Sequence, residues 1–347
     1  MPVKQKPYRV GISGSGFGLR AHFPAYNAHE RFEVVALASP HSAKSAAKER
    51  GVPNAFESCK EMLEGCDLDV VSIASPPFTH HPDTLAAIAA GKHVICEKPF
   101  ALSVAQAQEM LGAANSAKTA SAVMHEFRWV PQRFALKELV ANGHIDPLRE
   151  IEMTHLARML RLENTRPNTW WFDRSKGGGI AGALLSHMID SATWLAGRPP
   201  QRSTGYLRTA NPVRHDAAGN SFTISVDDGA FALVDYGGGV IARVTVDGTA
   251  AVDALTVAAH GENRTAVASG SGLHSMRLFS VDEDETAELE CKPSPNGRFA
   301  SIDPHVPPIM DLLDEFVKQI ETGDSIVPTF AEAVETQKVL ASVGFGS

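Results

Sequence analysis

The sequence lacks several features that mark membrane, secreted and metal-binding proteins. No apolar run approaches the length of a transmembrane helix, and residues 1–9 lack the apolar core of a signal peptide. The four cysteines (Cys59, Cys66, Cys96 and Cys291) match no zinc or redox spacing, and no HExxH motif is present. We therefore expect a cytoplasmic protein with reduced thiols and without a metal site.

Clustered positive charge is also missing. The 32 lysines and arginines are outnumbered by 40 acidic residues, which gives a net charge of −8, and they form no basic block. Nucleic acids and anionic membranes attract such blocks, so we expect neither as a partner. Hydrophobic residues make up 44% of the chain, which is typical of a globular protein, and 347 residues are enough for two domains.

A glycine-rich turn follows the first apolar strand. Residues 10–12 end that strand, and residues 13–18 form a turn that opens a helix. Glycine lets the backbone approach a ligand closely, and free N–H groups at a helix start bind anions. We predict that a dinucleotide binds here, at Gly14, Ser15, Gly16, Phe17 and Gly18. The third glycine lies one place early, and a merely flexible turn is the alternative.

Strands and helices alternate after this turn as far as residue 123. Strands are expected at 32–38, 70–74, 94–96 and 120–124, and helices at 21–29, 42–50, 57–64, 81–90 and from Ser103 onward. This alternation is typical of a parallel, doubly wound sheet. We therefore predict an α/β Rossmann domain over residues 1–123.

Residues 124–347 have a different pattern, which predicts an α+β domain. Alternating runs at 148–156, 222–226, 230–236, 240–246 and 254–259 favour a large, open, mostly antiparallel sheet. Helices are expected from Pro131 to residue 141 and at 184–196, 309–320 and 331–343. Because helices would cover only one face of such a sheet, we expect a homodimer or a homotetramer.

Several motifs carry a resemblance to a known enzyme family. They are SPPFTH at 75–80, AGKHVICEKP at 90–99, EFRWVP at 126–131 and GGGIAGALLSHMID at 177–190, with CEKP at 96–99 the most specific. The chain resembles the Gfo/Idh/MocA oxidoreductases along nearly its whole length. The resemblance implies an NAD(P)-dependent enzyme that acts on a sugar, a polyol or a related hydroxy compound, with a second domain built on an open sheet.

Two residues are the candidates for catalysis. Lys98 follows a strand at the ligand-binding edge of the sheet, where its ammonium would polarise a substrate oxygen. His187 suits proton removal from a hydroxyl near neutral pH. Many relatives carry an aspartate four residues before this histidine, where the chain has Ala183. The alternatives are a surface lysine beside a turn proline and a histidine hydrogen-bonded in the core.

The loop after the second strand bears on the choice of cofactor. NAD enzymes usually place Asp or Glu there to bind the ribose 2′-hydroxyl. The chain instead has Ser39, His41 and Lys44, among which a hydroxyl and a cation suit a 2′-phosphate. This favours NADP over NAD, although no arginine is present to grip that phosphate. An ordinary βα loop is the alternative.

The resemblance adds further candidates for ligand binding. The loop with Ser75, Pro76, Pro77 and His80 would lie against the cofactor, and Glu97 would lie close to the nicotinamide riboside. His80 equally suits a cap for the following helix. Candidate substrate contacts are Arg128, Trp170, Trp171 and Asp190. A structural salt bridge is the alternative for Arg128, and covering a domain joint is the alternative for the tryptophans.

The function that fits these residues best is hydride transfer between NAD(P) and a carbon that bears a hydroxyl or carbonyl, on a sugar or cyclic polyol. A nucleotide-binding regulatory or sensor protein with little turnover is the alternative, which Ala183 keeps open.

Overall fold

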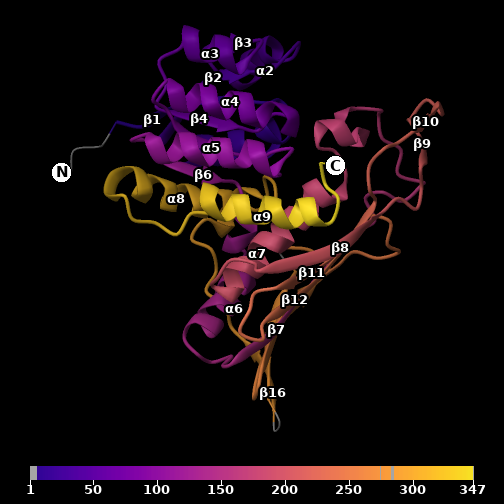
Figure 1. The fold of residues 1–347 in the computed structure, drawn as a ribbon. Coiled ribbons are helices and arrows are strands. Elements are labelled where there is room, and N and C mark those ends of the chain that lie inside the picture. Colours follow the sequence, from indigo (N-terminus) through magenta and orange to yellow (C-terminus); the bar gives the residue numbers. More distant parts are fainter. Residues whose placement is uncertain (1–5, 274, 283–284, 347) are drawn as a thin grey trace. The chain divides into compact units, whose positions relative to one another are not determined.

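Two large sheets organise the chain, one in each of two units (Figure 1). The computed structural model describes residues 6–273, 275–282 and 285–346. The first unit comprises residues up to 101, 105–126 and 294–334, and the second comprises 102–104, 127–293 and the residues from 335 onward. The sequence suggests a single boundary after residue 123, whereas residues 294–334 pack with the N-terminal unit.

The sheet of the first unit is parallel, with the strand order β3-β2-β1-β4-β5-β6. Its strands are β1 (Tyr8–Ser13), β2 (Phe32–Ala38), β3 (Asn54–Phe56), β4 (Val70–Ile73), β5 (His93–Cys96) and β6 (Ser121–Val123). Its helices are α1 (Phe23–Ala28), α2 (Ala43–Arg50), α3 (Cys59–Gly65), α4 (Pro77–Ala89), α5 (Val104–Ser116) and α8 (Val306–Thr322). This confirms the predicted Rossmann architecture.

Helix α8 explains why residues 294–334 join this unit. It buries Ile309, Leu312, Leu313 and Phe316, the stripe that the sequence shows, and it contacts α1. Removing this stripe from water stabilises the unit. Within the described ranges, no helix combines the length and the apolar character needed to cross a bilayer.

The second unit is built on an eight-stranded sheet in the order β16-β15-β14-β13-β7-β12-β11-β8. Its strands are β7 (Leu148–Leu156), β8 (Arg202–Arg208), β11 (Gly229–Asp235), β12 (Ile241–Asp247), β13 (Ala254–Gly261), β14 (Thr265–Gly270), β15 (Arg277–Val281) and β16 (Thr286–Leu289). Strands β7 and β12 pair in parallel, and the other pairs are antiparallel. The mostly antiparallel sheet is therefore confirmed.

Helices α6 (Pro131–Ala141) and α7 (Ser186–Ala196) lie against one face of this sheet (Figure 1). The other face carries exposed polar side chains, among them Arg243, whose guanidinium bonds Glu150 and Glu152 at 2.5 and 3.3 Å. The expected homo-oligomer stays a prediction. A short hairpin of β9 (Val213–His215) and β10 (Ser221–Thr223) forms a separate sheet, and α9 (Phe330–Ser342) is the last helix.

Candidate functional site

The glycine turn lies at the carboxyl end of β1, where the strand order of the first sheet reverses between β2 and β4. Gly14 has a φ of +114°, and a Cβ there would lie 2.2 Å from the carbonyl oxygen of Ala74. Gly16 is exposed, and a Cβ there would meet no atom of the chain within 4 Å. This open backbone beside a helix start fits a dinucleotide pyrophosphate, which needs close approach and free N–H groups.

Gly18 serves the packing of the helix start, and not the approach of a ligand. A Cβ there would lie 3.1 Å from Ile12 Cγ2 and 3.2 Å from the Ala74 Cβ, so this glycine lets the helix start pack closely on the sheet. It begins a π-helical turn, η1 (Gly18–His22), which leads into α1. The sequence analysis predicts an ordinary helix from residue 21 and does not predict this π-helical turn. π-turns are frequent at functional sites.

Two hydroxyls, those of Ser39 and Ser42, stand in the turn after β2, where an acidic residue would bind a ribose 2′-hydroxyl. Ser39 follows β2 and donates to Ser15 Oγ at 2.9 Å, and Ser42 donates to Ser39 Oγ at 2.9 Å. His41 has a φ of 68°, and Lys44 lies exposed in the first turn of α2. The loop therefore joins the adenosine side of the expected site to the glycine turn through Ser15.

The loop after β4 is tied to the Lys98–Pro99 turn by His80. This histidine is fully buried, and its Nδ1 and Nε2 lie 2.9 Å and 2.8 Å from the carbonyl oxygens of Pro99 and Ser75. Burial lowers the pKa of His80, although the hydrogen bonds with the two carbonyl oxygens act to raise it. Both ring nitrogens face the backbone, so these contacts make His80 a positioning residue. Direct cofactor contact by His80 stays a prediction.

Glu97 and Lys98 follow β5, at the same edge of the sheet as the glycine turn. Glu97 is buried and accepts from the Lys98 backbone N–H at 3.2 Å through Oε2. Its Oε1 lies 2.8 Å from Nε2 of His22, whose Nδ1 lies 2.8 Å from Ser72 Oγ. Burial raises the pKa of Glu97, but the hydrogen bond and charge of His22, followed by the charge of Lys98, hold it below its ordinary value.

The second unit presents its candidate histidine after another π-turn, η5 (Ala181–Leu185), which leads into α7. Two glycines make room for this start. A Cβ at Gly178 would lie 2.2 Å from the carbonyl oxygen of Trp171, and one at Gly179 would lie 2.6 Å from Asp227 Oδ1. Two glycines of the triple-glycine motif are thus explained by close packing within the unit.

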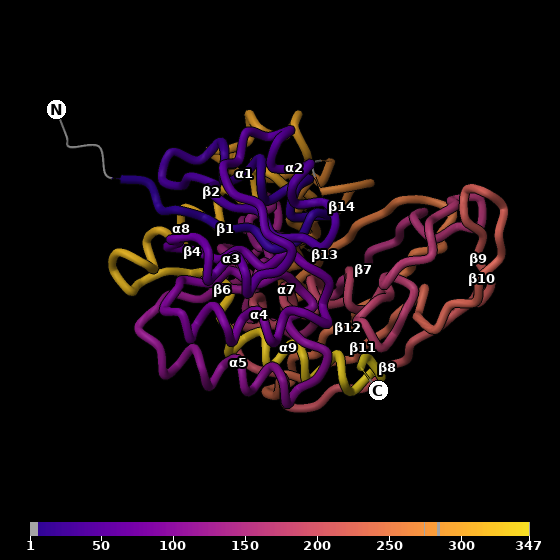
Figure 2. Tube along the Cα trace, turned by 90° about the horizontal axis from the view of Figure 1, so that it is seen from above, coloured from indigo at the N-terminus to yellow at the C-terminus, as the bar shows by residue number. Residues whose placement is uncertain are grey.

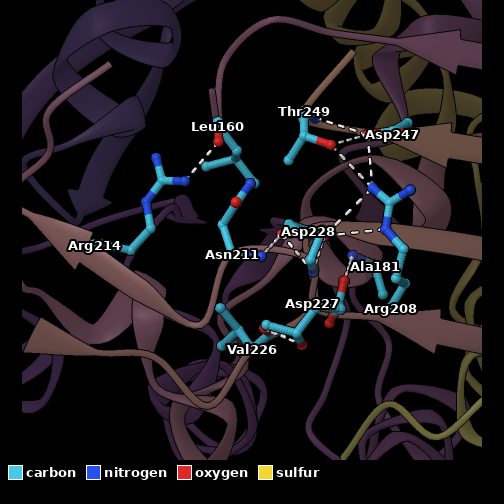
Figure 3. Close-up of polar contacts among 12 residues, drawn as sticks. Leu160, Ala181, Arg208, Asn211, Arg214, Val226, Asp227, Asp228, Asp247 and Thr249 are labelled. Carbon is cyan, nitrogen blue, oxygen red and sulfur yellow. Dashed lines mark hydrogen bonds and ion pairs between the residues drawn. The ribbon is translucent and has the colours of Figure 1, made fainter. Parts of the chain in front are cut away.

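Asp227 anchors this start and was missed by the sequence analysis. Its Oδ2 accepts from the Ala181 N–H at 2.7 Å (Figure 3). Burial raises the pKa of Asp227 to about 6, although backbone hydrogen bonds and the charge of Arg174 oppose the rise. The neighbouring Asp228 instead pairs with Arg208 at 3.4 Å. Asp227 and Ala181 are 46 residues apart in the sequence, so a local sequence pattern does not reveal this hydrogen bond.

His187 is buried, and its ring lies parallel to that of Phe127. The ring centres are 3.9 Å apart, with an interplanar angle of 12°. The Arg133 guanidinium lies 5.1 Å from the same phenyl ring and donates to Ser191 Oγ at 3.1 Å. The Phe127 ring therefore fixes the plane of the imidazole, while a buried cation contacts the same phenyl group.

Arg128 and Asp190 bind each other. The guanidinium donates through Nε and Nη2 to the two carboxylate oxygens at 2.8 and 2.6 Å, and both residues are buried. Such a bidentate pair is strong and geometrically specific. The structure thus favours the salt bridge that the sequence leaves open for Arg128, and it assigns Asp190 to the same pair. Trp170 and Trp171 are partly buried in the turn η3 (Trp170–Phe172).

Comparison with known proteins identifies the family of the chain. Residues 8–125 match the model of the oxidoreductase family with an NAD-binding Rossmann fold, and residues 134–267 match the Gfo/Idh/MocA C-terminal domain. The chain belongs to the Gfo/Idh/MocA family. As a member, it is an NAD(P)-dependent oxidoreductase with a Rossmann domain and an open-sheet second domain, as the motifs imply.

Named relatives cover most of the chain. It is 28% identical to an uncharacterized oxidoreductase of Synechocystis sp., over 97% of this chain and 93% of that protein. It is 27% identical to levoglucosan dehydrogenase of Pseudarthrobacter phenanthrenivorans, over 81% and 75% of the two chains. A solved levoglucosan dehydrogenase in complex with NADH superposes with a TM-score of 0.85 at 23% identity, covering 97% of this chain and 96% of that one. This last likeness concerns the fold.

Proposed function

We propose that this Gfo/Idh/MocA protein is a dehydrogenase that transfers a hydride to or from the hydroxyl- or carbonyl-bearing carbon of a sugar, a cyclic polyol or a related small molecule. The observation that carries the proposal is the position of Lys98. It follows β5 at the edge of the sheet where the open glycine turn follows β1. Ligands bind at this edge of open α/β sheets. The name of the relative levoglucosan dehydrogenase supports a sugar-like substrate.

The first unit supplies the residues that would hold the cofactor. The backbone at Gly14, Ser15 and Gly16 would bind the pyrophosphate, flanked by Phe17 and Gly18. The loop from Ser75 to Pro77 and the Glu97 carboxylate would lie along the nicotinamide half. When bound, the nicotinamide ring accepts or returns a hydride.

Lys98 and His187 would act on the substrate. In the oxidative direction the carbinol C–H bond breaks with its electron pair leaving as hydride, the O–H proton leaves to a base, and a C=O bond forms. His187 would take that proton, which suits a group that titrates near neutrality. The Lys98 ammonium would stabilise the negative charge that develops on the oxygen. In the reductive direction each group reverses its role.

NADP(H) is the proposed preferred cofactor. The Ser15–Ser39–Ser42 hydroxyls and the exposed Lys44 offer hydrogen bonds and a positive charge to a 2′-phosphate. An acid, which would repel that phosphate, is missing from the turn that follows β2, where Ser39, Pro40 and His41 stand.

A screen of hydride transfer tests the function. Levoglucosan, D-glucosides, free aldoses and inositols are incubated with NAD⁺ or NADP⁺, and reduced cofactor is followed by fluorescence. Turnover on at least one class is the expected result. Tight cofactor binding without turnover on any member would instead support a regulatory protein, the alternative suggested by Ala183 in place of the usual acid.

A further inference from the structure

The segment from residue 157 to residue 180 is basic in an acidic protein. It carries five cations (Arg158, Arg161, Arg166, Arg174 and Lys176) and two acids, Glu163 and Asp173, whereas the whole chain has a net charge of −8. This segment follows β7 and includes the turn with Trp170 and Trp171. Positive charge gathered in one segment raises the local concentration of anions.

The acids of the segment already have partners. Glu163 pairs with Arg161, and Asp173 pairs with Lys176 at 3.3 Å. Arg174 donates through Nε to the carbonyl oxygen of Ser225 at 3.1 Å. Two cations of the segment take no part in these contacts. They are Arg158, whose side chain is exposed to solvent, and Arg166, which is partly buried.

The guanidinium of Arg166 lies over an aromatic ring. Its guanidinium carbon is 5.2 Å from the centre of the Trp171 ring, and the guanidinium makes no hydrogen bond or ion pair with the residues that the structure describes. Burial lowers the pKa of Arg166, and the charge of Arg214 lowers it further. A partly desolvated cation beside a second cation is costly unless an anion joins it.

Arg214 is the second cation, and it is built into the unit. It lies on β9 with 3% of its surface exposed, and it donates to the carbonyl oxygen of Leu160 at 2.6 Å (Figure 3). It also donates to the carbonyl oxygens of Arg161 and Asn164 at 3.1 and 3.4 Å. Figure 2 shows the β9–β10 hairpin beside the segment that follows β7. Arg214 thus holds the backbone of the segment while adding a permanent charge near Arg166.

We infer that Arg166, held against Trp171 and reinforced by the charge of Arg214, binds the carboxylate of an acidic sugar. This inference rests on the proposed dehydrogenase function and narrows its substrate class to sugars that carry a carboxylate. The planar guanidinium fork matches a planar carboxylate with two parallel hydrogen bonds. The Trp171 ring, whose centre lies 5.2 Å from the guanidinium carbon, limits the orientations of the fork, which lowers the entropy lost on binding.

Calorimetric titrations of the full chain test the subsite. The probes are D-glucuronate, D-glucose and D-glucose 6-phosphate, the first two differing only in the carboxylate at C6. We expect D-glucuronate to bind the wild-type protein at least about tenfold more tightly than either other probe. Losing a charged hydrogen-bonded contact should weaken D-glucuronate binding to Arg166→Met by about ten- to a hundredfold and leave D-glucose unchanged.

Arg158→Met is the matched control, because it removes the same charge from an exposed position of the same segment. Equal D-glucuronate binding by Arg166→Met and Arg158→Met, at equal melting temperatures, would overturn the inference. Tighter binding of D-glucose 6-phosphate than of D-glucuronate would overturn the assignment to a carboxylate.

A separate assay of hydride transfer distinguishes the carboxylate subsite from the proposed dehydrogenase activity. Turnover of neutral sugars without Arg166-dependent D-glucuronate binding removes the subsite and keeps the dehydrogenase. Arg166-dependent binding without any turnover keeps the subsite and removes the dehydrogenase.

Discussion

Nε2 of His22 lies 2.8 Å from Oε1 of Glu97. Both side chains are buried, and the two residues are 75 positions apart in the sequence. Ser72 holds the other ring nitrogen, and the other carboxylate oxygen accepts from the Lys98 backbone N–H. The backbone at Lys98 is therefore positioned by a histidine that the π-turn η1 delivers. His22 acts on the candidate catalytic lysine through Glu97.

Breaking this pair should destabilise the protein in a pH-dependent way. His22→Ala leaves a buried carboxylate without its partner, which should lower the free energy of unfolding by about 3–5 kcal/mol at neutral pH. In the wild type the depressed pKa of Glu97 stabilises the fold above the ordinary value of 4.5, and this contribution is lost as the pH falls through the folded pKa. In the variant, burial raises the pKa of Glu97. The difference in the free energy of unfolding between wild type and His22→Ala should therefore narrow as the pH falls.

Urea unfolding at a series of pH values measures this difference. His81→Ala is the control, because His81 lies 2.8 Å from Glu109, whose side chain is 62% exposed to solvent. Its cost should stay below about 1 kcal/mol. Equal costs for the two variants would contradict the positioning role of His22.

Much of the fold can be predicted because it depends on local patterns. Strands β2 and β7 occupy residues 32–38 and 148–156, the runs that hydrophobic spacing indicates. The site is less predictable. The partners of Glu97 and Asp227 come from distant elements, and both π-turns insert residues that a regular helical period does not reveal. The sequence likewise leaves the role of Arg128 open, because its partner Asp190 is 62 residues away.

The glycines of the turn should separate folding from binding. Gly16→Val places its side chain in open space, so the fold should persist while cofactor affinity is lost. Gly14→Ala places a Cβ 2.2 Å from a carbonyl oxygen at a φ of +114°, which should cost at least about 2 kcal/mol of stability. Cofactor titration and urea unfolding of both variants check this. Unchanged cofactor affinity in a folded Gly16→Val protein would remove the turn from the site.

Cofactor preference should depend on Ser39. Wild type is expected to bind NADP(H) more tightly than NAD(H), and Ser39→Asp should reverse the order by repelling the 2′-phosphate. Ser45→Asp adds the same charge on the exposed side of α2 and should leave the order unchanged. Fluorescence titration with both reduced cofactors measures the affinities. A tenfold preference of the wild type for NAD(H) would show that the hydroxyls do not select the phosphate.

Asp227 should make stability fall as the pH rises. Its folded pKa of about 6 exceeds the ordinary 3.8, so the unfolded chain loses its proton first, and about 3 kcal/mol of stability is lost between these values. Asp227→Asn should remove this loss. Asp216 is the control, because hydrogen bonds from Asn220 lower its pKa and its contribution to stability should therefore rise with pH. Identical pH profiles for wild type and Asp227→Asn would contradict the assignment.

We propose that Lys98 and His187 carry out the chemistry of a sugar dehydrogenase. The most direct test of this proposal is kcat for Lys98→Met, His187→Ala and the double variant, on a substrate found by the sugar screen, beside the Kd for the cofactor. We predict a loss of about a hundredfold to a thousandfold for Lys98→Met. The predicted loss for His187→Ala is about a hundredfold to ten-thousandfold. The double variant should be little worse than the poorer single one, with cofactor affinity within a few fold of wild type. Normal turnover by either single variant would show that the replaced residue takes no part in catalysis.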